Sequence, residues 1–304
     1  MRAAPFCGEN KMKWLDVERF ESSNKNVIKF VFKNDSIAES VLYKYNTYEE
    51  RTVICCSTQS GCPVGCTFCG TGKKFLRNLD FKEIVEQVDY LINHSNVKIE
   101  MIKNFQIMFM SMGEPFLNFE ELKKAIYVLN YKYPNAKLLV STSAPFINFN
   151  VYSSFFNLAK EIDKIGLQFS LHESSDENRK LLIPTKTLQL IDISSLGLRF
   201  FNETTRKPFL NYCVHNNNCS DNDVENLIQL FDPNIFEFTL SVICEKDENI
   251  KSSIDRQLDL INNFNQKLIQ KGYSTRVFNP AGQDDIGGGC GQLWFVQKFF
   301  DNIK

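Results

Sequence analysis

The stretch that decides the fold is CPVGCTFC, residues 62–69, which contains Cys62, Cys66 and Cys69. Thiolates bind the irons of iron–sulfur clusters, and short spacings allow a single loop to hold a single cluster. The motif supplies only three thiolates, which leaves one iron of a 4Fe–4S cluster open to bind and activate a ligand. These three cysteines are therefore the predicted metal ligands.

The spacing of this motif, with Phe68 before the last cysteine, is the signature of radical-SAM enzymes. S-adenosylmethionine (SAM) would bind the open iron through its amine and carboxylate, and one electron would cleave it to a 5′-deoxyadenosyl radical. The alternative is a zinc site that uses these cysteines with His172 or another cysteine. Zinc motifs normally consist of two pairs of closely spaced cysteines or histidines, and the sequence contains no second pair.

The segments around the motif predict an α/β fold. RTVICC from Arg51 reads as a strand leading into the cysteine loop, and amphipathic helices then alternate with buried strands as far as STRVFN from Ser274. About six strand–helix units imply a parallel sheet with outer helices, closed part of the way into a barrel. We predict a radical-SAM partial (β/α)6 barrel with the cysteine loop at the carboxyl edge of its strands.

The N-terminal part of the chain reads differently. Residues 1–25 show no periodicity and are predicted to be a loose lead-in, before strands that start near Val27 and Ser40. We therefore expect a short β-rich segment over residues 1–50. Residues 51–304 would form the radical-SAM core with a C-terminal cysteine segment.

Bulk properties narrow the class of protein. The 304 residues, 43% of them hydrophobic, suffice for one large core, and the net charge of −1 gives no global basic field. Any contact with nucleic acid must then come from a local patch. The start of the chain lacks the apolar region of a signal peptide, and no apolar run is long enough to span a membrane, so we expect a soluble, cytoplasmic protein. Ten cysteines in such a chain favour metal or redox chemistry over disulfides.

Several residues at predicted strand ends are candidates for binding SAM. Gly113 offers a backbone that a ligand can approach closely, and the Glu114 carboxylate suits the SAM ammonium group. A plain turn at the end of a strand would use the same residues. The serine hydroxyls would reach ribose or carboxylate oxygens or, alternatively, cap helices, and His172 is alternatively a core histidine. The predicted SAM-binding residues are Gly113, Glu114, Ser141, Ser170, Leu171 and His172.

Five stretches together resemble one family. They are CCSTQSGCPVGCTFCGTGKKFLRNL from Cys55, FMSMGEPFLN from Phe109, VSTS from Val140, SLHESSDENRKLLIP from Ser170 and DDIGGGCGQL from Asp284. The chain resembles the radical-SAM RNA methyltransferases of the RlmN/Cfr type, which methylate adenine carbons in ribosomal and transfer RNA. The resemblance runs from about Lys29 to Leu293. It implies a 4Fe–4S cluster and two SAM molecules per turnover.

The resemblance also implies three catalytic residues. One SAM would methylate Cys290, and the radical from the second would activate that methyl group to add to adenine. Cys55 would then resolve the covalent protein–RNA adduct, with Glu39 as a base. Cys55 could instead be a buried strand cysteine, and Glu39 a solvated strand residue. Cys290, in a glycine-rich turn, is hard to explain as core packing. Because neighbouring strand residues face opposite ways, only one of Cys55 and Cys56 would face the site, and the offset from Cys62 selects Cys55.

The sequence departs from the family pattern where the substrate is expected to bind. We expect the chain to lack the usual N-terminal accessory domain of the family. Cys244 and Glu245 stand where the family has Asn-Pro. RNA phosphates would meet a basic rim, although a solvated charged face explains the same residues. The candidates for this rim are Lys73, Lys74, Arg77, Arg179, Lys180, Arg206 and Lys207.

These observations leave competing functions. The first is an RNA adenine methyltransferase, expected to be a monomer that receives electrons from a flavodoxin-like partner. The second is a radical-SAM enzyme that modifies a peptide or small molecule on the same scaffold. The third is an iron–sulfur module without catalysis, against which Gly113, Glu114 and Cys290 count.

Overall fold

One curved sheet of ten strands organises the molecule. The computed structural model describes residues 13–71, 74–242, 250–278 and 286. The strand order is β1-β2-β3-β4-β7-β8-β9-β10-β11-β12, and β5 and β6 form a separate hairpin. The strands are β1 (Asp16–Glu21), β2 (Val27–Lys33), β3 (Ile37–Tyr45), β4 (Arg51–Cys56), β5 (Gln59–Gly61), β6 (Phe75–Asn78), β7 (Asn104–Phe109), β8 (Ala136–Thr142), β9 (Ile165–Ser170), β10 (Phe209–Val214), β11 (Glu237–Val242) and β12 (Ser274–Phe278).

The direction of strand pairing in the sheet changes at β4. Strands β1 to β4 pair antiparallel, whereas all pairs from β4 to β12 are parallel. Parallel neighbours need crossover connections, and helices supply them here. The helices are α1 (Phe81–Ser95), α2 (Phe119–Lys132), α3 (Phe149–Glu161), α4 (Asp176–Leu182), α5 (Leu190–Thr204), α6 (Asp221–Leu230) and α7 (Ile250–Gln270), with short 3-10 turns η1 (Ile99–Met101) and η2 (Pro115–Asn118).

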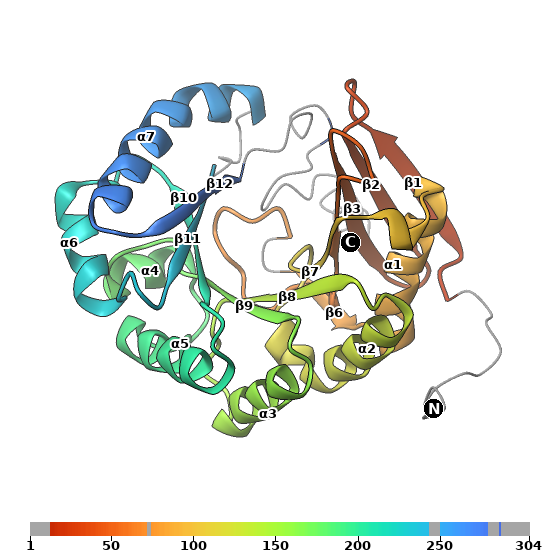
Figure 1. Ribbon diagram of the computed structural model, residues 1–304, viewed down its shortest axis with the longest axis horizontal. Helices are drawn as coiled ribbons and strands as arrows, with labels where there is room; N and C mark the ends of the chain where they lie inside the picture. The colour runs from red at the N-terminus through yellow and green to blue at the C-terminus, as the bar shows by residue number, and fades with distance from the viewer. Residues whose placement is uncertain (1–12, 72–73, 243–249, 279–285, 287–304) are drawn as a thin grey trace.

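The helices lie on the outer, convex side of the curved sheet (Figure 1). Six strand–helix units follow one another, namely β4–α1, β7–α2, β8–α3, β9–α5, β10–α6 and β11–α7, before β12 ends the series. The predicted partial (β/α)6 barrel is confirmed. All these strands end on the same side, so the loops that follow them gather at one carboxyl edge.

The curvature brings the two ends of the sheet near each other. Tyr43 on β3 meets Phe278 on β12 edge to face, with ring centroids 5.9 Å apart. Both rings line a cavity of about 850 Å³ inside the sheet. The concave face therefore encloses a space whose walls come from both halves of the chain.

Local sequence explains the helix ends. Asp80 accepts from the Glu83 amide and Glu83 accepts from the Asp80 amide, a capping box that starts α1. In α5 the helix needs Gly197, because a Cβ there would lie 2.3 Å from the Phe236 ring. Among the described residues, each helix is too short or too polar to cross a membrane.

The structure corrects three sequence-based predictions. Residues 1–25 are not all a loose lead-in, because Asp16–Glu21 form the edge strand β1, where exposed side chains hide the alternation. The helix α5 was not predicted, although Leu190, Ile193, Leu196 and Phe200 recur at helical spacing on its buried face. The cysteine loop does not follow β4 directly, since the strand β5 comes between them.

Candidate active site

The cysteine loop is tied to two different parts of the fold. Cys62 donates its amide to the carbonyl of Lys74 at 2.8 Å, and Thr67 donates its amide to the carbonyl of Leu182 in α4 at 3.0 Å. Gly61, with φ of +80°, enters the loop where a Cβ would lie 2.2 Å from the Lys74 oxygen. These contacts fix the loop at the carboxyl edge of the sheet, as the sequence predicted.

The three loop cysteines fit an iron–sulfur cluster in their chemistry. Cys62, Cys66 and Cys69 are thiols of intermediate burial. Burial raises the pKa of Cys62 to about 12, and bound iron would favour the thiolate instead. No three His, Cys, Asp or Glu side chains among the described residues converge on one point as a single metal ion needs. A cluster takes one thiolate on each iron, so it does not require that convergence.

Glu114 is held at the end of β7 by a full set of hydrogen bonds. Its Oε1 accepts from Thr142 Oγ1 at 2.6 Å and from the Phe116 amide at 3.0 Å. Its Oε2 accepts from the amide and hydroxyl of Ser143, at 2.7 and 2.8 Å. A carboxylate offers about four lone-pair sites, and these bonds fill them. The predicted contact of this carboxylate with SAM stays a prediction, and the hydrogen bonds favour a structural role for it.

Gly113 holds a backbone conformation that suits glycine. Its φ is +100°, and a Cβ there would lie 2.6 Å from the Cβ of Gln59. Gln59 Oε1 also accepts from the Glu114 amide at 2.8 Å. The close approach of these two segments beside the cysteine loop therefore requires a residue without a side chain.

The serines at the next strand ends face each other. Ser141 Oγ lies 3.5 Å from Ser170 Oγ and accepts from Gln168 at 3.0 Å. The helix-capping alternative is wrong for both, because Asn148 caps α3 and Ser175 caps α4. Their predicted contact with SAM remains open.

His172 links the cysteine loop to the sheet. It is buried with φ of 64°, its Nδ1 accepts from the Cys213 amide at 3.2 Å, and its ring meets Phe68 edge to face at 5.2 Å. Burial, with nearby Arg179 and His215, lowers the pKa of His172 to about 3, so its imidazole is neutral. Leu171 before it is fully buried and donates its amide to the Asn211 carbonyl at 2.9 Å.

The predicted basic rim does not form as expected. Arg179 is buried and donates to the carbonyls of Ser143, Ser170, Leu171 and Leu188, so it locks strand ends instead of facing solvent.

The other arginines and lysines predicted for the basic rim also do not gather on one surface. Arg77 is held by Glu83 and Asp35. Arg206 and Lys207 precede β10, at the edge of the sheet opposite the cysteine loop. Lys73 lies outside the described residues, and Lys180 is exposed.

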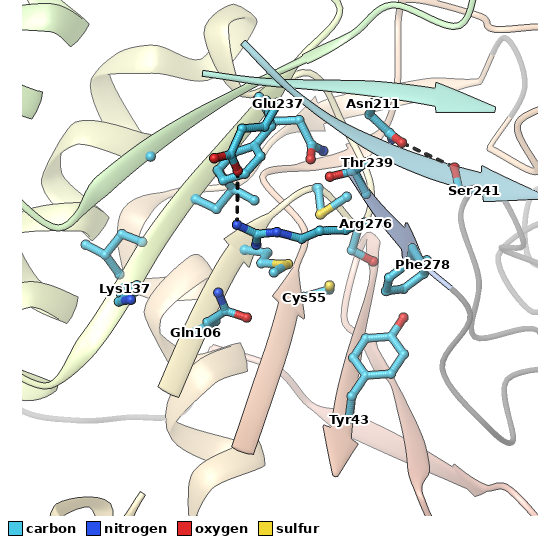
Figure 2. Close-up of a pocket in the computed structure, with 18 of the residues that line it drawn as sticks. Tyr43, Cys55, Gln106, Lys137, Asn211, Glu237, Thr239, Ser241, Arg276 and Phe278 are labelled. Carbon is cyan, nitrogen blue, oxygen red and sulfur yellow. Dashed lines mark hydrogen bonds and ion pairs between the residues drawn. The ribbon is translucent and has the colours of Figure 1, made fainter. Parts of the chain in front are cut away.

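The cavity inside the sheet contains the second group of predicted residues. Glu39 on β3 and Cys55 on β4 both line it, together with Met108 and Ser111. Figure 2 shows Cys55 pointing into this space near Tyr43. Cys56 points the other way into the core and lies within 3.7 Å of the Met108 carbonyl. The two cysteines face opposite ways, and the one in the cavity is Cys55, as predicted; its catalytic role stays a prediction.

Glu39 is a buried residue, and the solvated alternative is wrong. Its side chain is fully buried and forms an ion pair with that of Lys29 on β2, which is also fully buried. Burial raises the pKa of Glu39, and the ammonium group of Lys29 opposes that rise. Sequence reasoning missed Lys29, although a lone lysine inside the apolar run VIKFVF was a visible signal.

Cys290 lies outside the described residues. Ile286, four positions earlier, is buried in a cluster with Val41, Tyr43 and Cys55. Ile286 thus packs against residues of the cavity wall that contains Cys55.

Comparisons with known proteins agree with this geometry. Residues 56–192 match the family model of the Radical SAM superfamily, whose members use a 4Fe–4S cluster and SAM. The chain is 29% identical to "Ribosomal RNA large subunit methyltransferase N" from Nitrosopumilus maritimus, over 91% of this chain and 80% of that protein. It is 32% identical to "Probable dual-specificity RNA methyltransferase RlmN" from Chlorobium phaeobacteroides, over 81% of this chain and 67% of that protein.

A solved structure shows the same fold. A radical SAM methyltransferase from Sphaerobacter thermophilus superposes with a TM-score of 0.73 at 27% identity, covering 90% of this chain and 79% of that one.

Proposed function

The chain belongs to the RlmN family of radical-SAM methyltransferases, and from that premise we propose that it methylates a carbon of adenine in RNA. The observation that carries the proposal is the pairing of two sites in one molecule. A loop with three cysteines lies at the carboxyl edge of a partial barrel. A cavity lined by Cys55 and Glu39 lies inside that barrel. The relatives' names supply the substrate class, ribosomal or other RNA.

The cluster and SAM, when bound, supply a methyl group and a radical that withdraws hydrogen from a carbon. Cys62, Cys66 and Cys69 would hold the cluster, and Gly113, Ser141 and the Ser170–His172 segment would lie around SAM. The neutral imidazole of His172 keeps the cysteine loop against β9 and β10.

The methyl carrier in this proposal is Cys290. A thiolate is a strong nucleophile, so it can accept a methyl group from SAM and then form the adduct with adenine. Four residues of chain span at most about 14 Å, so Cys290 stays within reach of the Ile286 position on the cavity wall. Cys55 on that wall would attack the Cys290 sulfur and free the product, and Glu39 would take up a proton.

The substrate would be bound by local contacts, because the chain has a net charge of −1. We further propose that the enzyme acts as a monomer in the cytoplasm and receives its electron from a flavodoxin-like protein. The N-terminal β-rich segment, residues 1–50, extends the sheet next to the cavity through β2 and β3.

A direct assay tests the proposal. The reconstituted protein is incubated with reductant, SAM carrying a deuterated methyl group, and unmodified transcripts of large-subunit ribosomal RNA and transfer RNA. We expect labelled methyladenosine after digestion to nucleosides, and its retention time distinguishes carbon 2 from carbon 8. Labelled protein with no labelled nucleoside in either transcript would refute RNA as the substrate.

A further inference from the structure

A buried lysine pairs with a buried glutamate that lines the cavity. The ammonium group of Lys29 on β2 pairs with the carboxylate of Glu39 on β3, and neither side chain is exposed. Removing two charges from water is costly, so buried pairs usually have further hydrogen bonds. Apart from the ion pair, neither carboxylate oxygen of Glu39 has a hydrogen-bond partner among the described residues. Such a carboxylate retains lone pairs that can accept a proton.

The strand register puts this pair beside Cys55. Val41 on β3 lies opposite Lys29 on β2 and opposite Cys55 on β4. Glu39 is two residues from Val41, so its side chain is on the same face and is a diagonal neighbour of the other two. Such diagonal neighbours lie roughly 7–8 Å apart. Glu39, Val41 and Cys55 all line the cavity.

The backbone of Glu39 is fixed independently of its side chain. Its carbonyl accepts from the hydroxyls of Ser57 and Ser111, both at 2.6 Å. The strand position of Glu39 therefore does not depend on Lys29. Lys29 contacts the carboxylate of that residue.

We propose that Lys29 is a positioning residue that keeps Glu39 ionised and directed at the cavity, where Glu39 takes up the proton lost from the adenine carbon during adduct resolution. In that step the ring C–H bond breaks, its electron pair restores the aromatic ring, and an O–H bond forms on Glu39; the unpaired electron left by radical addition would pass to the oxidised iron–sulfur cluster. When Cys55 forms an S–S bond with Cys290, the C–S bond breaks and its carbon takes up a proton as the methyl group of the product. Lys29 keeps its own protons throughout. The inference rests on the proposed function and deepens it.

Charge explains why the lysine is needed. A buried carboxylate without a cation nearby is neutral at ordinary pH and cannot accept a proton. Burial raises the pKa of Glu39 and lowers that of Lys29, and each partner opposes the effect on the other. Among the described residues, the other titratable groups that line the cavity on β3 and β4 are Tyr43, Tyr45, Arg51 and Cys55. The charged groups that line it from the other elements are Lys137, Asp163, Lys164, Arg206, Lys207, Glu237 and Arg276.

The test compares Lys29→Met, Glu39→Gln and the double variant in the reconstituted full chain. Each is given SAM, reductant and an unmodified transcript of large-subunit ribosomal RNA, and the covalent protein–RNA adduct and released RNA are followed on denaturing gels. We expect Lys29→Met to accumulate adduct and to release product roughly 10²-fold more slowly, the typical effect of losing a general base. The double variant should release product at the rate of Glu39→Gln alone, because Lys29 acts through Glu39.

The pH profile separates this role from a structural one. In Lys29→Met, release should recover as pH rises and Glu39 ionises, whereas Glu39→Gln should show no such recovery. Cys55 is present in every variant, so the difference between these two profiles isolates Glu39. Iron content and thermal melting report folding, and the double variant remains informative if Lys29→Met folds poorly, since it contains neither charge of the pair.

Two results would overturn the inference while leaving the proposed function intact. One is release from Lys29→Met at the wild-type rate at every pH. The other is a further loss when Lys29→Met is added to Glu39→Gln. Wild-type protein that forms neither methylated Cys290 nor an adduct would overturn the proposed function, and the role of Lys29 with it.

Discussion

Two buried glutamates, Glu114 and Glu39, show how the carboxyl edge and the cavity differ. Burial raises the pKa of both carboxyl groups. Glu114 nevertheless accepts four hydrogen bonds, one from η2 and three from the end of β8. Glu39 has an ion pair with Lys29 and, among the described residues, no hydrogen bond to either carboxylate oxygen.

The difference teaches which carboxylate is available for chemistry. The lone pairs of Glu114 are used in joining strand ends, as are the donors of Arg179, so the carboxyl edge is a preformed frame beside the cysteine loop. The oxygens of Glu39 are held by one flexible cation next to Cys55. We infer that the edge positions ligands, whereas the cavity supplies reactive groups.

The largest expected effect on activity comes from removing a predicted cluster ligand at the carboxyl edge. Cys62→Ala should abolish iron binding and cleavage of SAM, because the cluster loses one of only three predicted thiolate ligands. Iron content and the yield of 5′-deoxyadenosine measure this. Cys219→Ala is the matched control, since this cysteine lies far along the chain beside α6 and should leave both quantities unchanged. A cluster-loaded, active Cys62→Ala protein would disprove the metal assignment.

The next largest effect should come from the cavity. Cys55→Ala should stop turnover after one event and trap a covalent protein–RNA adduct, because no thiol remains to attack the Cys290 sulfur. Denaturing gels with labelled RNA detect the adduct. Cys56→Ala is the control on the same strand, since its side chain points into the core. Normal product release by Cys55→Ala would refute the resolving role.

Stability measurements sharpen the contrast between the glutamates. Glu114→Gln replaces an oxygen acceptor by a donor among four donors, and should lower the free energy of unfolding by about 1–3 kcal/mol. Replacing the buried ion pair with neutral groups, in the double variant Lys29→Met and Glu39→Gln, should cost little. Chemical denaturation compares the two. Equal losses would mean that both sites are structural in the same way.

The smallest expected effect concerns pH. The pKa of His172 is lowered to about 3, so the unfolded chain binds a proton below about 6.5 that the folded chain does not. Stability from this residue is therefore present above pH 6.5 and is lost as pH falls toward 3. Between pH 7.5 and 5.5 the loss should be about 1.4 kcal/mol, and His172→Gln should remove that part of the pH dependence. Identical pH profiles for the two proteins would contradict the account.

Local sequence patterns were enough to predict the overall fold. The CPVGCTFC motif and the strand–helix alternation predicted the partial barrel. Alternation predicted that only one of Cys55 and Cys56 faces inward, and the offset from Cys62 predicted that it is Cys55. These features depend on neighbours in the chain. The strand β1 was missed because an exposed edge strand has no clear alternation.

Contacts between distant segments could not be predicted. The sequence shows that Arg179 is charged but not that five carbonyl and hydroxyl oxygens from strands and loops surround it. Likewise, the pairing of Lys29 with Glu39 depends on the register of β2 and β3, which a single sequence leaves open.

Mass spectrometry of the peptide that carries Cys290 tests the central claim most directly. The protein is purified without air, its cluster is reconstituted, and SAM and reductant are added. The account predicts one added methyl group on Cys290, which the cavity residues would then process. An unmodified Cys290 with 5′-deoxyadenosine still produced would contradict it, and would indicate a radical-SAM enzyme with a different reaction.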